Sequence, residues 1–183
     1  MIPHARVDPR LHPDEAIDHI RGPASAPVTV IEYGDFECPS CVQAHGAIAI
    51  MLAHFANQVR FVFRHFPLRE VHPHAELAAE ASEAAAAQGR FWPMHDMLMA
   101  HSPHLKPKHL LDYAGQLRLD IARYENEMKD HVYLQRVQEH VHSGQQLGVR
   151  ATPAFYVNGV FIDVSFGLQH LQASIDQALQ PRS

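Results

Sequence analysis

The stretch GDFECPSCVQAH, Gly34 to His45, contains the only two cysteines of the chain, Cys38 and Cys41. Pro39 and Ser40 separate them, so the two thiols form a Cys-X-X-Cys motif. Three interpretations are open for such a pair: a redox-active dithiol, half of a metal site, or two unrelated thiols. The residues on either side of the motif decide among them.

The motif lies where a predicted strand gives way to a predicted helix. The preceding stretch, APVTVIEYGDF, is nearly continuous in apolar character and rich in β-branched residues, which is typical of a strand buried on both faces. After the motif, Pro39 suits a first helical turn, and apolar residues recur at helical spacing as far as Phe55. A second strand follows at Val59 to Phe66. The three segments predict a βαβ unit with parallel strands.

A cysteine at the start of a helix is a good candidate nucleophile. The unpaired N–H groups of the first turn and the positive end of the helix dipole stabilise a thiolate, and only a thiolate attacks a disulfide. We therefore predict that Cys38 is the nucleophile and that Cys41, one turn later, is the resolving thiol. This position within a βαβ unit favours the redox-active pair over the other two interpretations.

The remainder of the chain predicts a helical block followed by a hairpin. From about Pro73 to Gly148 the pattern indicates four or five helices and no clear strand. Asn158-Gly159 then separates two apolar runs, which is a strong signal for a type I′ hairpin turn. A last helix has Leu168, Leu171, Ile175 and Leu179 on one face. A short strand is also expected near Ile17 to Ile20.

One acidic residue is a candidate for proton transfer. Glu32 precedes Cys38 by six residues and falls in the strand that we expect to be buried. A buried carboxylate with a raised pKa could exchange a proton with Cys41. The alternative is an exposed residue on a face of the sheet.

The sequence resembles the DsbA-like branch of the thioredoxin superfamily. The stretches that carry the likeness are APVTVIEYGDFECPSC, FVFRHFPL, AELAAEASEAAAAQGRFWPMHDML and LGVRATPAFYVNG. The resemblance implies an α/β, thioredoxin-like fold with a helical insertion. It implies a thioredoxin-like domain at 26–68 and 149–183 and an inserted helical subdomain at 69–148. Residues 1–25 are rich in proline, histidine and charge and are interpreted as an N-terminal extension.

The resemblance also implies roles for individual residues. Cys38 is the nucleophile and Cys41 the resolving cysteine of a redox-active disulfide. Thr152-Pro153 is the cis-proline loop, which offers its backbone to a passing substrate chain. The family's buried acidic position falls on Glu32.

The motif departs from that of the best-known periplasmic oxidant of the family, which has histidine where this chain has Ser40. That histidine helps to stabilise the thiolate, and an uncharged serine should support it less. We therefore expect the pKa of Cys38 to lie below the free value of about 8.5 and above the extreme of about 3.5. The pair should accordingly be less oxidising than that enzyme.

Composition excludes several classes of protein. The chain has 183 residues, of which 46% are hydrophobic and 19% charged, with a net charge of -5. No basic stripe stands out, so nucleic acid is not an expected partner. Nothing approaches the roughly 18 consecutive apolar residues of a membrane span. Residues 1–25 lack the apolar core of a secretory signal, which predicts a cytoplasmic protein, or a periplasmic or extracytoplasmic one if a leader has been removed.

The sixteen histidines raise the question of a metal. Those at 72–74 and 140–142 could join the cysteines in a metal site, but we interpret the scattered histidines as solvated surface and expect no metal and no cofactor. Arg64 and His65 are likewise interpreted as a surface pair, with electrostatic tuning of the thiol site as the alternative. Phe91 and Trp92 are interpreted as packing anchors, with a hydrophobic substrate groove near Phe36 and Pro39 as the alternative.

The predicted function is thiol–disulfide exchange with protein substrates and an unidentified redox partner; the oligomeric state is left open. One alternative is a non-catalytic redox-sensing or interaction module, since domains of this family also occur appended to membrane transporters. Another is a glutathione-dependent transferase or isomerase of the same fold. Those relatives typically have serine at the nucleophile position, and the complete Cys-X-X-Cys motif argues against that alternative.

Overall fold

The computed structural model describes residues 7–180 and contains one five-stranded sheet and seven α-helices within them. The strands are β1 (His19–Arg21), β2 (Val28–Gly34), β3 (Val59–His65), β4 (Ala154–Val157) and β5 (Val160–Ile162). The helices are α1 (Pro39–Phe55), α2 (Ala75–Ala86), α3 (Phe91–Ala100), α4 (Pro107–Gln116), α5 (Ile121–Lys129), α6 (Leu134–Gln146) and α7 (Gln169–Leu179). Short 3-10 turns lie at Pro9–Leu11 and Ala56–Gln58.

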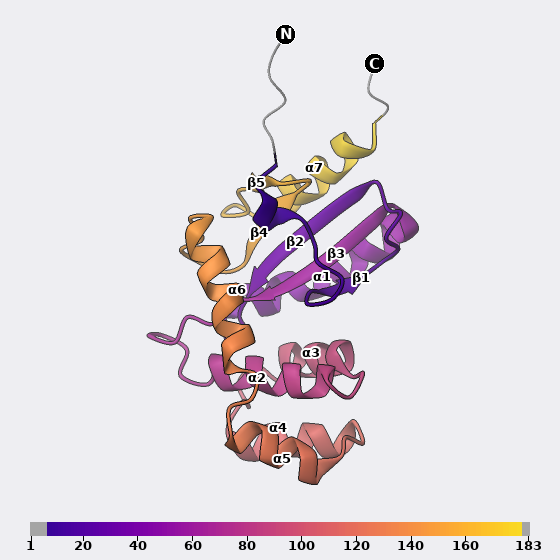
Figure 1. Ribbon diagram of the computed structural model, residues 1–183. Helices are drawn as coiled ribbons and strands as arrows, with labels where there is room; N and C mark the ends of the chain where they lie inside the picture. Colours follow the sequence, from indigo (N-terminus) through magenta and orange to yellow (C-terminus); the bar gives the residue numbers. More distant parts are fainter. Residues whose placement is uncertain (1–6, 181–183) are drawn as a thin grey trace. The chain divides into compact units, whose positions relative to one another are not determined.

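The sheet has the strand order β1-β3-β2-β4-β5. β1 pairs antiparallel with β3, and β4 pairs antiparallel with β5. The arrowheads of β2 and β3 lie at the same end of the sheet in Figure 1, so these two strands run parallel. The strand–helix–strand unit predicted around the cysteines is therefore confirmed, with α1 as the crossover.

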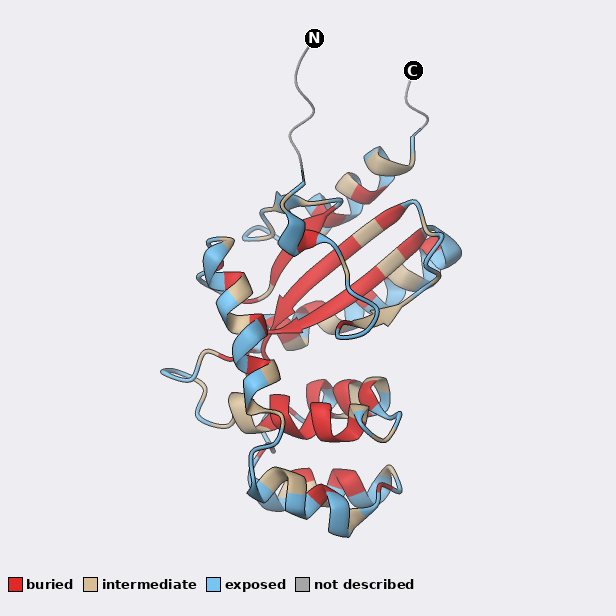
Figure 2. Ribbon diagram, in the orientation of Figure 1, coloured by how far each residue is buried: buried red, intermediate tan, exposed pale blue. Residues whose placement is uncertain are grey.

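The central strands are buried along almost their whole length. Six of the seven residues of β2 are buried, and so are six of the seven residues of β3; Figure 2 shows both strands in the colour of buried residues. This is the burial expected of apolar strands in the middle of a covered sheet. The prediction that Glu32 lies in a buried strand is confirmed, because Glu32 is only 3% exposed.

The chain forms two compact units. The first consists of the described parts of Met1–Glu32, Ala47–Arg64 and Ala154–Ser183, and contains most of the sheet with α7. The second consists of Tyr33–Gly46 and His65–Pro153, and contains the start of α1 with helices α2 to α6. The predicted limits of the inserted subdomain, 69–148, stay a prediction.

The hairpin of the first unit has the predicted turn. Asn158 and Gly159 have φ angles of 47° and 83°, which are the positive values that a type I′ turn requires at both central positions. The Asn158 side chain accepts a hydrogen bond from the backbone N–H of Thr29 at 2.8 Å, and its own N–H donates to the Thr29 carbonyl at 2.9 Å. These two hydrogen bonds join the turn to the beginning of β2.

A buried ion pair stabilises the first unit. The Arg64 guanidinium donates from Nε and Nη2 to the two carboxylate oxygens of Asp18, at 2.8 and 2.7 Å, and from Nη1 to the Arg10 carbonyl at 2.6 Å. The side chains of Arg64 and Asp18 are 7% and 1% exposed. Our interpretation of Arg64 as a surface charge is therefore wrong, because an arginine can be buried when its donors are matched by a carboxylate and backbone carbonyls.

An Asp18→Ala variant is expected to lose about 3 kcal/mol of unfolding free energy, because it leaves the Arg64 charge buried without its carboxylate. Urea denaturation monitored by circular dichroism measures the change. Glu139→Ala is the matched control: it removes the exposed partner of a pair with the partly exposed Arg136, 3.7 Å apart, and should cost less than about 1 kcal/mol. Equal effects of the two substitutions would contradict this account.

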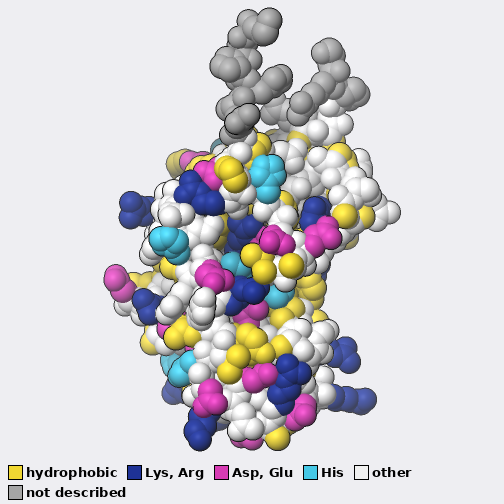
Figure 3. Space-filling model, viewed as in Figure 1, with side chains coloured by type: hydrophobic (Ala, Val, Ile, Leu, Met, Phe, Trp, Pro, Cys, Tyr) yellow, Lys and Arg dark blue, Asp and Glu magenta, His cyan; other side chains and the backbone are white. Residues whose placement is uncertain are grey.

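Two surface properties bear on function. On the face that Figure 3 displays, basic and acidic side chains are interspersed. Among residues 7–180, no helix combines the length and the apolar character that a membrane crossing needs.

Candidate active site

The two cysteines lie at the beginning of α1, within the second compact unit. A turn brings the chain into the helix: the Cys38 N–H donates to the Asp35 carbonyl at 3.2 Å, and the Cys38 carbonyl accepts from the Val42 N–H at 3.1 Å. Pro39, with no N–H, occupies the first helical position as predicted. Both cysteines are free thiols, and Cys38 is 6% exposed whereas Cys41 is fully buried.

The environment of Cys38 favours its thiolate. A hydrogen bond from the Cys41 side chain is the largest cause, and it lowers the pKa of Cys38 to about 5 against the opposing effect of burial. The Thr152 side chain and the backbone N–H groups of Cys41 and Ser40 lower this pKa further. The value lies between about 3.5 and about 8.5, as predicted from serine at position 40. The contribution of the two backbone groups agrees with the predicted effect of the helix N-terminus.

The Thr152-Pro153 segment lies beside Cys38. The peptide bond between the two residues is cis, as the resemblance implied. The Cys38 thiol donates to the Thr152 carbonyl, with 3.4 Å between Sγ and oxygen. The Thr152 hydroxyl is buried and makes no hydrogen bond to another group among residues 7–180, so it is available to the sulfur. Pro153 is half-buried, and Pro39 and Ser40 are exposed.

Asp35 organises the turn before the motif, a role that the sequence analysis missed. Its buried carboxylate accepts hydrogen bonds from the backbone N–H groups of Glu37 and Leu68 and from Nδ1 of His72, each at 2.8 Å. Its own backbone N–H donates to the Cys41 sulfur at 3.4 Å. One residue thus joins the segment before Cys38 to the segment after β3. The available sequence signal was an aspartate in a turn, where its side chain readily accepts backbone hydrogen bonds.

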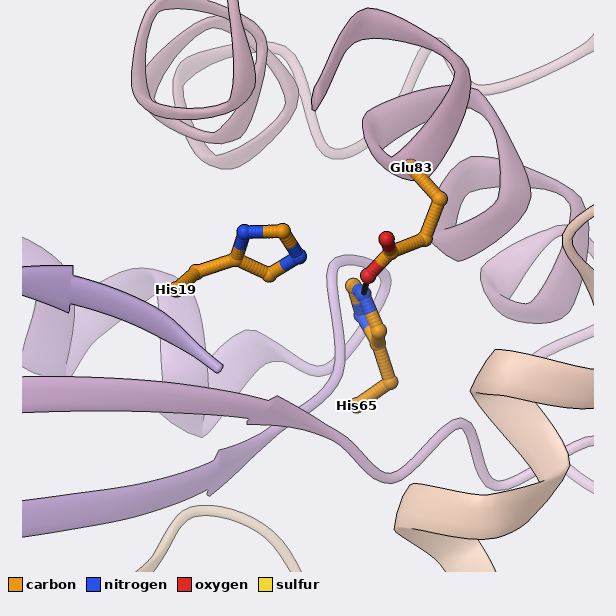
Figure 4. A group of neighbouring side chains, drawn as sticks. All are labelled: His19, His65 and Glu83. Atoms are coloured by element: carbon orange, nitrogen blue, oxygen red, sulfur yellow. Dashed lines mark hydrogen bonds and ion pairs between the residues drawn. The ribbon is translucent and has the colours of Figure 1, made fainter. Parts of the chain in front are cut away.

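A layer of buried aromatic and imidazole rings lies next to the motif. The Phe36 ring contacts His65 and His95, with centroid separations of 6.0 and 5.5 Å. His65 stacks on His140 at 5.4 Å, and its Nε2 lies 2.7 Å from a carboxylate oxygen of Glu83; Figure 4 shows that carboxylate facing the His65 ring.

The interpretation of the histidines as solvated surface is therefore wrong for His65, His95 and His140, which are 1%, 2% and 4% exposed. An imidazole can be buried when its nitrogens find partners: Nδ1 of His140, for example, accepts from the backbone N–H of His65 at 3.2 Å. The interpretation of Phe91 as a packing anchor is confirmed by its 6% exposure, whereas its neighbour Trp92 is half-buried.

The structure brings four of the predicted site residues together: Cys38, Cys41, Thr152 and Pro153. Ser40 contributes through its backbone N–H. The roles assigned to these residues and to Glu32 stay predictions at this point.

Sequence relatives point to the same family. The family model described as Thioredoxin matches residues 15–177. A curated relative, the Na(+)/H(+) antiporter NhaA 1 of Salinispora arenicola (strain CNS-205), is 45% identical over 181 residues, which cover 96% of this chain and 28% of that relative. The chain therefore spans less than a third of the length of this curated relative.

Solved structures show the same fold. BdbD from Bacillus subtilis (oxidised) superposes with a TM-score of 0.83 at 24% identity, covering 92% of this chain and 96% of that one. A thioredoxin-like oxidoreductase from Silicibacter pomeroyi DSS-3 gives a TM-score of 0.76 at 26% identity, covering 96% and 95%. Wolbachia pipientis alpha-DsbA1 gives 0.77 at 20% identity, covering 92% and 93%. The chain therefore belongs to the thioredoxin family, and its fold is that of the DsbA-like thiol–disulfide oxidoreductases.

Proposed function

We propose that this chain is a thiol–disulfide oxidoreductase that exchanges the Cys38–Cys41 dithiol and disulfide with protein substrates. The observation that carries the proposal is the stabilised thiolate: the pKa of Cys38 is lowered to about 5 beside a second free thiol that is fully buried. A cysteine that is ionised at neutral pH attacks disulfides, and a neighbouring protected thiol can only act on the intermediate.

In the reducing direction, the Cys38 thiolate attacks one sulfur of a substrate disulfide. A bond forms between Cys38 and that sulfur, and the other substrate sulfur leaves as a thiolate. Cys41 then loses its proton and attacks the Cys38 sulfur, which releases the second substrate thiolate and leaves a Cys38–Cys41 disulfide. Two electrons pass from the dithiol to the substrate, and the oxidising direction reverses each step.

We propose that Thr152 and Pro153 bind the substrate chain next to the sulfur. The Thr152 carbonyl lies 3.4 Å from the Cys38 sulfur. Only the protonated thiol donates to this carbonyl: the thiolate and the mixed disulfide have no S–H, so in both states the carbonyl is free to accept an N–H from the backbone of the substrate. Glu32, buried in β2, is proposed to exchange the proton of Cys41.

A second candidate function rests on the sequence relative. Because the 45% identical relative is named as a Na(+)/H(+) antiporter, the chain could serve as a redox-sensing module of such a transporter. The same cysteine chemistry would then report the oxidation state of the surroundings rather than turn over substrates. Both candidates require a Cys38–Cys41 pair that is oxidised and reduced reversibly, and they differ in whether a separate disulfide substrate is turned over.

The test is the reduction potential of the pair, measured by equilibration with glutathione buffers. A Cys38 pKa of about 5 lies between those of thioredoxin, about 7, and DsbA, about 3.5, so we expect a potential between about -270 and -120 mV. A potential near -270 mV would favour a reductase that works in a reducing compartment. A potential near -120 mV would favour an oxidant that works in an oxidising compartment. Failure to form the disulfide at all would overturn the proposal.

A further inference from the structure

Three potential metal-binding side chains converge in the second compact unit, outside the thiol site. They are His45 on α1 and the adjacent residues His95 and Asp96 on α3. Their ligand atoms all lie within 4.8 Å of one another. Nδ1 of His95 is 2.9 Å from Oδ1 of Asp96, and Nε2 of His45 is 3.9 Å from the same oxygen.

The spacing is close to that of a bound transition metal. Ligand atoms about 2.0–2.2 Å from a tetrahedral zinc ion lie about 3.3 Å apart. Since the ligand atoms of the cluster are at most 4.8 Å apart, zinc binding needs adjustments of at most about 1.5 Å at the side-chain tips. The His45 and Asp96 side chains, 26% and 43% exposed, are on the outer side of the cluster and can make that adjustment.

The third side chain is held in place. The His95 side chain is 3% exposed, and its ring contacts the rings of Phe36, Phe91 and Trp92 at centroid separations of 5.5, 5.8 and 5.1 Å. The His45 ring lies against it at 5.4 Å. An imidazole fixed in this way loses little freedom when it binds a metal, which is the condition for a preorganised site.

We propose that His45, His95 and Asp96 form a zinc site, with a water molecule in the fourth position. Two imidazoles and one carboxylate are a ligand set that suits Zn²⁺. Mg²⁺ and Ca²⁺ prefer oxygen ligands, and this cluster offers a single carboxylate. These are not the histidines at 72–74 and 140–142 that the sequence offered as possible ligands, and the sequence alone predicted no metal.

Zinc binding at this cluster can be distinguished from zinc binding by the two thiols. Cys41 and His45 are separated by one helical turn on α1, so a zinc titration of the reduced protein could report thiolate ligands instead. The protein with a Cys38–Cys41 disulfide has no thiolate. Zinc binding by this oxidised form therefore depends on the imidazole and carboxylate groups alone.

The experiment is a calorimetric titration of the oxidised protein with ZnCl₂. We expect one equivalent to bind, with an affinity at least tenfold lower in His45→Gln and in Asp96→Asn, and no comparable binding of MgCl₂ or CaCl₂. Both substitutions are at partly exposed positions, and circular dichroism checks that the variants are folded. Binding that is unchanged in both variants would overturn the proposal.

Surface histidines provide the matched control. The rings of His104 and His109 lie 5.3 Å apart, nearly the separation of His45 and His95, but among residues 7–180 they are not grouped with a carboxylate into a three-ligand cluster. A His104→Gln/His109→Gln variant should keep the wild-type affinity and stoichiometry. If this variant lost the zinc and His45→Gln did not, the site would lie elsewhere. The titration measures zinc binding and not disulfide exchange, and the Cys38→Ser/Cys41→Ser variant, which also has no thiolate, gives the same test without a disulfide, so a failure of the proposed function would not hide the outcome.

Discussion

A Cys38→Ser variant is expected to lose disulfide exchange by roughly a thousandfold or more, because it removes the thiol whose thiolate is stabilised, which is also the more exposed of the two. Cys41 cannot replace it, since its thiol is fully buried. The rate of reduction of insulin by the dithiol form measures the loss. Ser40→Ala, which removes an exposed hydroxyl between the two cysteines, is the matched control and should remain active. Activity retained in Cys38→Ser would mean that the roles of the cysteines are wrongly assigned.

Cys41→Ser should have a different phenotype, because it removes the resolving step and leaves the attacking step intact. The Cys38 thiolate still attacks a disulfide, and the resulting mixed disulfide then persists. Intact-mass spectrometry after incubation with a disulfide-bonded peptide should find one peptide half attached at Cys38. The Cys38→Ser/Cys41→Ser double variant should carry none. If Cys41→Ser accumulated no adduct with any disulfide tested while Cys38→Ser did, the assignment would have to be reversed.

The parts of the fold that were predictable are those specified by local sequence. Pro39 at the first turn, the continuous apolar strands on either side of α1, and Asn158-Gly159 between two apolar runs each restrict the backbone within a few residues. The Cys-X-X-Cys motif belongs to the same class, since a spacing of two residues at the beginning of a helix by itself brings the second thiol next to the first. The structure places all of these features where the sequence predicted them.

The contacts that were missed join residues far apart in the chain. Arg64 is buried because Asp18 supplies its counter-charge, and His65 is buried against Glu83. Periodicity describes only which face of an element a residue occupies, so a charged residue in a strand is indistinguishable from a surface residue until its partner is known. The role of Asp35 was missed for the same reason, because the donors that hydrogen-bond to its carboxylate belong to Leu68 and His72 as well as to its own turn.

The second prediction with a large expected effect concerns how the reactivity of Cys38 depends on pH. With a pKa of about 5, the Cys38 thiol is ionised to about 99% at pH 7, whereas a cysteine at the ordinary value of 9.0 is almost entirely protonated. Alkylation of the reduced protein by iodoacetamide should therefore be fast at pH 7 and should slow only as the pH falls through about 5. A midpoint near 9 would contradict the stabilised thiolate.

The lowered pKa of Cys38 also makes the reduced protein less stable as the pH falls. The pKa of Cys38 is lower in the folded protein than in the unfolded chain, so between about pH 5 and 9 the unfolded state binds one more proton. The stabilisation is complete above about pH 9 and is lost as the pH falls to about 5, at a slope of at most about 1.4 kcal/mol per pH unit. The oxidised protein has no thiolate, so the pH dependence of the difference in unfolding free energy between the reduced and oxidised forms isolates this effect from the many histidines and from the contribution of the disulfide itself, which does not depend on pH.

The causes of the shift can be ranked by substitution. The Cys41 side chain makes the largest contribution that lowers the pKa of Cys38, and the Thr152 side chain makes the next largest. Cys41→Ala should therefore raise the alkylation midpoint more than Thr152→Val, which removes a hydroxyl and keeps the shape of the side chain. Ser40→Ala keeps its backbone N–H, the group through which position 40 acts, and should leave the midpoint near 5. If Ser40→Ala shifted the midpoint as far as Cys41→Ala, the thiolate would be stabilised by the side chain at position 40 rather than by the buried thiol beside it.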